Sequence, residues 1–307
     1  AVLGLARELP QSANTLADAL YNIAGSGFYG AEALDILEIS AKAAAAGMTT
    51  TDNSAKAIVA TLNAYGLGAE SAARVSDALF NTVNYGVLSY EELTAAVAHF
   101  VGNAAAAGIT IEEAGAALAT MTLSGLSASE AGVSLNNMIS KLIKPSEALS
   151  ATVEELGINL QEDLANPAIG LHGVMERLRV ESEGNLKTLL KWFPEIRAAR
   201  GALALMSAEG ENYTRVFKGM GTEQANAAAT QRAYNEVAKS TAHQFETLKG
   251  SIESTAIELG LVLLPYVNQA ISFLSSLGGQ VKSVAGDIAS SMGPGFQAWG
   301  DAIRDVV

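Results

Sequence analysis

The chain has 307 residues, is 49% hydrophobic but only 6% aromatic, contains no cysteine and carries a net charge of −13. This size and hydrophobic content allow a substantial core in one elongated or two compact domains, while the lack of cysteine excludes a disulfide framework, a thiolate zinc site and a cysteine nucleophile. Residues 1–172 hold 18 acids and 6 bases, against 14 acids and 13 bases in residues 173–307, so sequence-independent DNA binding by the first part is not expected.

Helices are predicted throughout the first part of the chain, because capping residues and glycines recur between apolar stretches of helical period. The predicted helices cover about residues 12–24, 31–46, 51–66 and 69–84. Gly47 is expected to end the second helix in the left-handed conformation. Thr51 or Asp52 is expected to cap the third.

An alanine-rich block occurs twice in this region. The two copies begin AAAAGMT at Ala43 and AAAAGIT at Ala104, and they continue to GLGA at Gly66 and GLSA at Gly125. The glycines that close the alanine runs, Gly47 and Gly108, are 61 residues apart, and Gly66 and Gly125 are 59 apart. We infer a duplicated structural unit, in which alanine lets helix axes approach closely. The runs 43–47 and 104–108 are therefore expected to be packing interfaces.

Capping boxes give the firmest helix starts. They occur at Ser89–Glu92, Thr110–Glu113 and Ser127–Glu130, where the two side chains of each pair satisfy free backbone N–H groups. Three adjacent acidic pairs could instead supply a general acid and base, namely Glu91–Glu92, Glu112–Glu113 and Glu154–Glu155. Capping explains two of these pairs without a further assumption, and the three histidines lack metal-ligand spacing. The sequence thus predicts no enzyme, no cofactor and no metal site.

After the Lys144–Pro145 break the pattern changes. A helix is predicted at about 146–157, a connector at 158–170, and further helices at about 171–181, 185–193 and 194–208. Basic residues gather in this region, at Arg177, Arg179, Lys187, Lys191, Arg197 and Arg200. A solvated amphipathic face explains them, and a face for an acidic partner or nucleic acid is the alternative.

The longest predicted helix runs from Thr222 to Leu259, where Gly250 is the only internal glycine and no proline occurs. Apolar and small residues follow a 4-3-4-3-4-3-4 spacing at Tyr234, Ala238, Thr241, Phe245, Leu248, Ile252, Thr255 and Leu259. This spacing is typical of a coiled-coil or bundle seam, and it predicts an interface for self-association. Thr241 and Thr255 weaken the seam, so a bundle and a free coiled coil both remain open.

No charged residue occurs from Leu259 to Val281. The stretch is long enough for a membrane span, yet Pro265 and several polar residues favour a packed, proline-kinked helix. If it enters a membrane, the inserting residues would be Leu261, Val262, Leu263, Leu264, Pro265, Ile271, Phe273 and Leu274. One more short helix is predicted after Gly293–Pro294.

Five motifs, in order along the chain, resemble the conserved core region of the phage tail tape measure protein family. They are the paired alanine-glycine units, KLIKPS at 141–146 followed by LGI at 156–158, WFPEIRA at 192–198, ALAL at 202–205 and ELGLVLLP at 258–265. The resemblance implies a helical virion protein that lies in the tail lumen or tail tip, sets tail length during assembly in the host cytoplasm, and assists genome delivery. It also implies contacts with tail tube protein, tail assembly chaperones, tail-tip proteins and the host membrane during infection. Contact with further copies of itself is expected from the small-residue faces and the seam, and no specific DNA contact is expected from the charge distribution.

Together these features predict an all-α, multi-helix array of short helices with an internal repeat of about 60 residues, followed by a longer coiled-coil-like or bundle helix. The predicted parts are a repeat domain at 1–165 with units at about 43–73 and 104–132, a helical connector region at 166–221, and a long helix with apolar C-terminal helices at 222–307. Frequent Gly and Pro argue against one rod, so we expect a folded module of a longer tape. The lack of an initiator Met fits a fragment or processed form. The alternative function is a membrane-active, pore-forming protein acting through residues 259–281.

Overall fold

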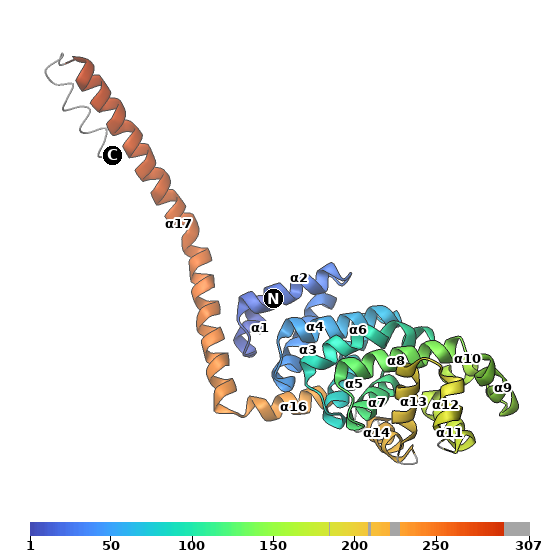
Figure 1. The fold of residues 1–307 in the computed structure, drawn as a ribbon. Helices are drawn as coiled ribbons and strands as arrows, with labels where there is room; N and C mark the ends of the chain where they lie inside the picture. The colour runs from blue at the N-terminus through green and yellow to red at the C-terminus, as the bar shows by residue number, and fades with distance from the viewer. Residues whose placement is uncertain (184, 208–209, 222–227, 292–307) are drawn as a thin grey trace. The chain divides into compact units, whose positions relative to one another are not determined.

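The computed structural model describes residues 1–183, 185–207, 210–221 and 228–291, and every regular element within these ranges is helical (Figure 1). The predicted all-α fold class is confirmed. Internal contacts divide the chain into two units, Ala1–Ser251 and Ile252–Val307.

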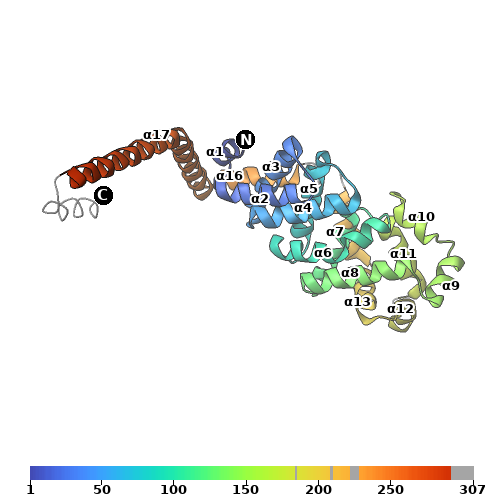
Figure 2. The same cartoon turned by 90° about the horizontal axis from the view of Figure 1, so that it is seen from above.

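The first unit is an array of short helices in two layers (Figures 1 and 2). Helices α2, α4, α6 and α8 pack side by side in one layer, and α3, α5 and α7 form the second layer against it. Later helices extend both layers, because α13 packs on α8, α14 on α7, and α16 on α3 and α5. The bounds are α1 Val2–Glu8, α2 Ala13–Gly25, α3 Gly30–Gly47, α4 Thr51–Tyr65, η1 Ala69–Ser71, α5 Ala72–Tyr85, α6 Tyr90–Ala106, α7 Ile111–Leu123, α8 Ala128–Ile143, α9 Glu147–Glu155, α10 Leu160–Ala165, α11 Gly170–Ser182, α12 Leu186–Trp192, α13 Ile196–Met206, α14 Glu211–Gly221 and α16 Ala229–Ala238.

Each copy of the repeat is a set of three helices. The first copy comprises α3, α4 and α5 with its leading turn η1, and the second comprises α6, α7 and α8. The middle helices begin at equivalent caps, Thr50 and Thr110, whose side chains accept from the third backbone N–H of the helix. Both are followed by a left-handed glycine, Gly66 with φ 62° and Gly125 with φ 90°. The cap of α4 is thus Thr50, and not Thr51 or Asp52 as predicted, because only Thr50 precedes the first helical residue.

The predicted stop at Gly47 is wrong by one residue. Gly47 is the last residue of α3, and Met48 adopts the left-handed conformation with φ 51°. The reason lies in packing, because a Cβ at Gly47 would lie 2.7 Å from Cδ2 of Tyr90 on α6. Glycine is needed there for close approach, so the strained turn falls on a methionine that is 94% exposed.

Small residues do bring helix axes together, as the alanine-rich composition predicts. A Cβ at Gly132 of α8 would lie only 2.8 Å from the carbonyl oxygen of Ala96 on α6, and one at Gly201 of α13 would lie 3.0 Å from the carbonyl oxygen of Ser134 on α8. In the first alanine run, Ala43 is buried in a small cluster with aromatic residues of α5 and α6. A glycine of one helix therefore packs directly against the backbone of its neighbour at two successive crossings, α6–α8 and α8–α13.

Two predicted segments differ from the structure. Residues 158–170, expected as a connector, contain the short helix α10. The expected continuous helix 222–259 is interrupted, because α16 ends at Ala238 and α17 spans Thr241–Ser291. Ser240 separates them, since its Oγ accepts from the backbone N–H of His243 at 3.2 Å and so caps the new helix. Residues 222–227 and the short helix predicted after Pro294 lie outside the described residues.

Candidate interaction surfaces

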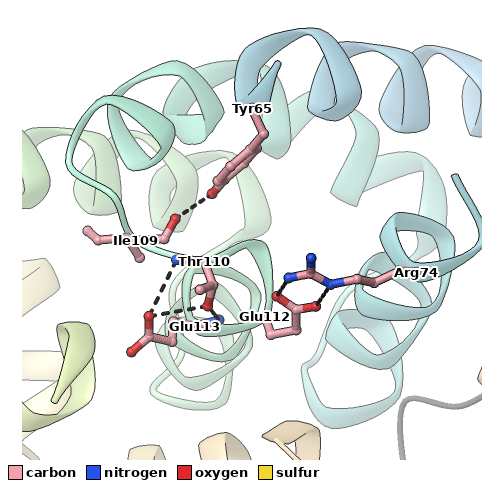
Figure 3. A network of polar contacts seen from close by, with 6 residues as sticks. All are labelled: Tyr65, Arg74, Ile109, Thr110, Glu112 and Glu113. Carbon is pink, nitrogen blue, oxygen red and sulfur yellow. Dashed lines mark hydrogen bonds and ion pairs between the residues drawn. The ribbon is translucent and has the colours of Figure 1, made fainter. Parts of the chain in front are cut away.

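A polar network joins the two copies of the repeat (Figure 3). The Tyr65 hydroxyl of α4 donates to the carbonyl oxygen of Ile109 at 2.8 Å. Arg74 of α5 forms a bidentate pair with Glu112 of α7, through Nε at 2.8 Å and Nη2 at 3.0 Å. Burial, followed by the nearby Glu112 carboxylate, raises the pKa of Tyr65 well above its usual range. The network therefore holds a neutral phenol and a fixed ion pair, which suits a joint between repeats rather than proton transfer.

Glu113 is a buried carboxylate that serves two helices at once. It closes the capping box of α7, where its own N–H donates to Thr110 Oγ1 at 3.2 Å and its Oε2 accepts from the Thr110 backbone N–H. The start of α11 also faces it, where the backbone N–H groups of Leu171 and His172 favour its charged form. Gly170, with φ 57°, makes this possible, because a Cβ there would overlap the carboxylate. Burial raises the pKa of Glu113, and these hydrogen bonds oppose the shift.

The buried carboxylate of Asp77, on α5, likewise accepts hydrogen bonds from the start of a later helix, α16. Its Oδ2 accepts from the backbone N–H of Ala228 at 2.9 Å, and its Oδ1 accepts from that of Thr230 at 2.8 Å. The hydroxyls of Ser76 and Thr230 lie 3.0 Å apart beside this carboxylate. Ala228 is held in the left-handed region with φ 57°. Sequence reasoning missed this contact and the one to α11, because a cap is recognised by local spacing and these partners are far apart in the chain.

The remaining polar cluster near Glu113 is built for packing. The His172 ring stacks on Phe217 with centroids 4.7 Å apart, and its Nε2 lies 3.0 Å from Thr214 Oγ1. Burial lowers the pKa of His172, which favours the neutral ring. Within the described ranges no group of three His, Asp or Glu side chains is placed to hold a metal ion.

A model of the phage-related minor tail protein family matches residues 1–231. The chain belongs to this family. It is 29% identical over its full length to a probable tape measure protein of Clostridium phage phiCD119. It is also 24% identical, over 87% of its length, to the tape measure protein of Pneumococcus phage Dp-1. The chain spans 33% and 23% of these two relatives, and no solved structure matches it.

The predicted seam of this tail protein is divided between two helices. Tyr234 on α16 is buried and packs edge-on against the ring of His243 at 5.3 Å, and Ala238 is half-buried at the end of that helix. On α17, Phe245 is 71% and Ile252 64% exposed, and Leu248 and Leu259 are exposed as well. The side chain of Thr241 lies outside the described residues. The interface therefore stays a prediction, with an uncovered apolar face only from Phe245 onward.

The residues predicted to enter a membrane also lie on α17, which continues through Pro265 to Ser291. Val262, Leu263, Leu264 and Pro265 are exposed. The side chains of Leu261, Ile271, Phe273 and Leu274 lie outside the described residues. In the described part of the chain, no helix has the length and apolar content needed to cross a bilayer.

The second alanine run borders a hollow of about 790 Å³ between the ends of α6 and α8 and the helices α9 and α10. Gly108 has φ 73°, and a Cβ there would lie 2.6 Å from that of Ala165 on α10. This predicted packing residue thus contacts α10, which lies within the segment predicted to be a connector. The hollow is lined largely by aliphatic side chains and holds no charged cluster suited to chemistry.

Proposed function

We propose that this chain is a folded module of a tape measure protein that sets tail length during assembly and lies in the tail lumen or at the tail tip. The observation that carries the proposal is the family match over the helical array, together with the similarity to two tape measure proteins. Because the chain spans only a third or less of those relatives, most of the ruler would lie in sequence beyond it.

The structure suggests how such a module divides its work. In the first unit short helices fold back on one another, so residue number does not convert into distance there. Helix α17 is different, because its 51 residues form one helix, which spans about 77 Å at about 1.5 Å per residue. Among the described elements, only α17 is long enough to act as a ruler segment. The array of short helices would act as a compact anchoring module.

An insertion experiment in the parent phage gene tests the ruler role. Seven extra heptads placed in α17 add about 49 residues and should lengthen tails by about 74 Å, as measured by electron microscopy. The control inserts a Gly/Ser segment of equal length at Gly125, in the turn between α7 and α8. Tails of unchanged length after the α17 insertion would refute the ruler role of this helix.

The exposed face of α17 supports self-association as part of this function. Apolar side chains at heptad spacing on a helix pack against partner helices of the same kind, and Ile252→Glu should therefore lower the oligomeric state measured by sedimentation velocity. Ile257→Glu is the matched control, because it places the same charge on the opposite side of the helix. Equal oligomeric states for the two variants would remove this interface. Contacts with tail tube protein, assembly chaperones and tail-tip proteins, and assistance in genome delivery, belong to the same proposal.

A further inference from the structure

One corner of the array combines exposed aliphatic side chains with bases. The end of α8, the end of α12 and the start of α13 meet there, and they expose Ile143, Leu190 and Ile196. Ile196 is the most open of the three at 66%. Covering an exposed aliphatic side chain of this size with a partner is favourable, because it removes apolar surface from water.

Hydrogen bonds hold this corner in one shape. The Ser146 hydroxyl, just after α8, lies 3.1 Å from the carbonyl oxygen of Lys191 and 3.0 Å from that of Trp192, both at the end of α12. Lys141 of α8 pairs with Glu195 at 2.8 Å in front of α13. A surface fixed in this way loses little conformational entropy when it binds.

Bases flank the aliphatic side chains, and Lys144, Lys191 and Arg197 are all exposed. Lysines at helix C-termini complement the helix dipole, which accounts for Lys144 and Lys191. The helix dipole does not account for Arg197, which lies at the start of a helix. It also does not account for the exposed Ile196 beside it. A local excess of positive charge in a chain of net charge −13 favours an acidic, partly apolar partner.

The first helices of the same array present such a surface. Tyr21 on α2 is 79% exposed and Tyr29 before α3 is 69% exposed. Asp18 lies one turn before Tyr21 and Glu32 one turn after Tyr29, and both are exposed. Each tyrosine is therefore about one helical turn from a carboxylate. Helices α2 and α3 pack on each other, and they lie at a different part of the array from α8, α12 and α13 (Figure 1).

We propose that the α2–α3 surface of one copy docks on the α8–α12–α13 corner of a second copy. The carboxylates of one copy would face the bases of the other, and the tyrosines would cover the exposed aliphatic groups. The two contacting surfaces differ, so the interface is heterologous and each copy keeps a free surface of either kind. Such a contact builds a ring or an open helical stack rather than a closed pair. It is independent of α17 and of the ruler role.

Charge reversal in the full chain tests the contact. All variants carry Ile252→Glu, so that association through α17 does not contribute. Lys191→Glu with Arg197→Glu reverses the corner, and Asp18→Lys with Glu32→Lys reverses the α2–α3 surface. Each variant alone should associate at least about tenfold more weakly in sedimentation velocity, and an equimolar mixture of the two should associate again because opposite charges then face each other.

The control reverses two exposed bases on α14, Arg215→Glu and Lys218→Glu, and should leave association unchanged. Raising the salt concentration from about 50 to about 500 mM should weaken the wild-type contact. The proposal is overturned if the reversed variants associate like the parent, if the mixture stays dissociated while circular dichroism shows folded chains, or if the corner binds anionic lipid vesicles with no association between copies.

Discussion

Replacing Asp77 tests whether the repeat holds α16 in place. In Asp77→Asn the side chain keeps one oxygen for one N–H group, but its amide NH₂ must face the other backbone donor, of Ala228 or Thr230. The variant therefore loses one charge-assisted hydrogen bond and weakens a second, each worth about 1.5–3 kcal/mol. It also leaves a donor without an acceptor in a buried setting, since Thr230 is 6% exposed. We expect a loss of about 2–4 kcal/mol in the free energy of unfolding.

Hydrogen exchange locates that loss. The backbone amides of Ala229–Ala238 should exchange faster in Asp77→Asn, while those of α6 and α8 should keep their protection. Asp35→Asn is the matched control, because Asp35 is exposed on α3 and should change neither stability nor exchange measurably. If α16 in Asp77→Asn exchanges at the wild-type rate, the carboxylate does not hold this helix and the reasoning fails.

Burial raises the folded-state pKa of Glu113. Its contribution to the free energy of unfolding is therefore present below the unfolded pKa and is lost as the pH rises through the folded pKa. Urea unfolding measured from about pH 4.5 upward should show this decrease in stability, and the pH dependence should disappear in Glu113→Gln. Met48→Gly should raise the free energy of unfolding by about 1 kcal/mol, because glycine takes φ 51° without strain; an unchanged midpoint in urea would argue against strain at this turn. Gly132→Ala should cost about 1–3 kcal/mol, because its Cβ would press on the carbonyl oxygen of Ala96. Gly102→Ala, in open space on α6, should be neutral or stabilising, and an equal loss at the two glycines would contradict the packing argument.

The features that sequence analysis predicted correctly are local ones. All three capping boxes are present, and each depends on two residues three positions apart. The turn at Gly66 likewise follows from a glycine after an apolar helix. The rule that a glycine after an apolar helix takes the left-handed turn fails at Gly47. The side chain of Tyr90, more than forty residues later in the chain, packs against that glycine and leaves no room for a Cβ there. A single sequence does not reveal which of two roles a glycine fills when both are common.

The seam illustrates the same limit at a larger scale. Its spacing is regular through residues 234–259, yet Ser240 starts a new helix and Tyr234 is drawn into the array. The heptad spacing identifies the side chains on the apolar face of a helix. It does not show whether that face packs against the same chain or against a partner. Phe245 and Ile252 keep the seam hypothesis open, because the described part of the chain leaves them exposed. The predicted division at residues 165 and 221 also stays a prediction.

Asp77 and Glu113 add a consequence for how the molecule assembles. Each is buried in the repeat, and each is stabilised by backbone N–H groups at the start of a helix that is synthesised later. A repeat that ended before α11 would leave Glu113 without the N–H groups that oppose its burial, and one that ended before α16 would do the same to Asp77. The repeat is therefore completed by the later helices, as well as supporting them. Truncations placed between the predicted repeat domain and its connector should for this reason be less stable than the full array, although they would remove no residue of the repeat itself.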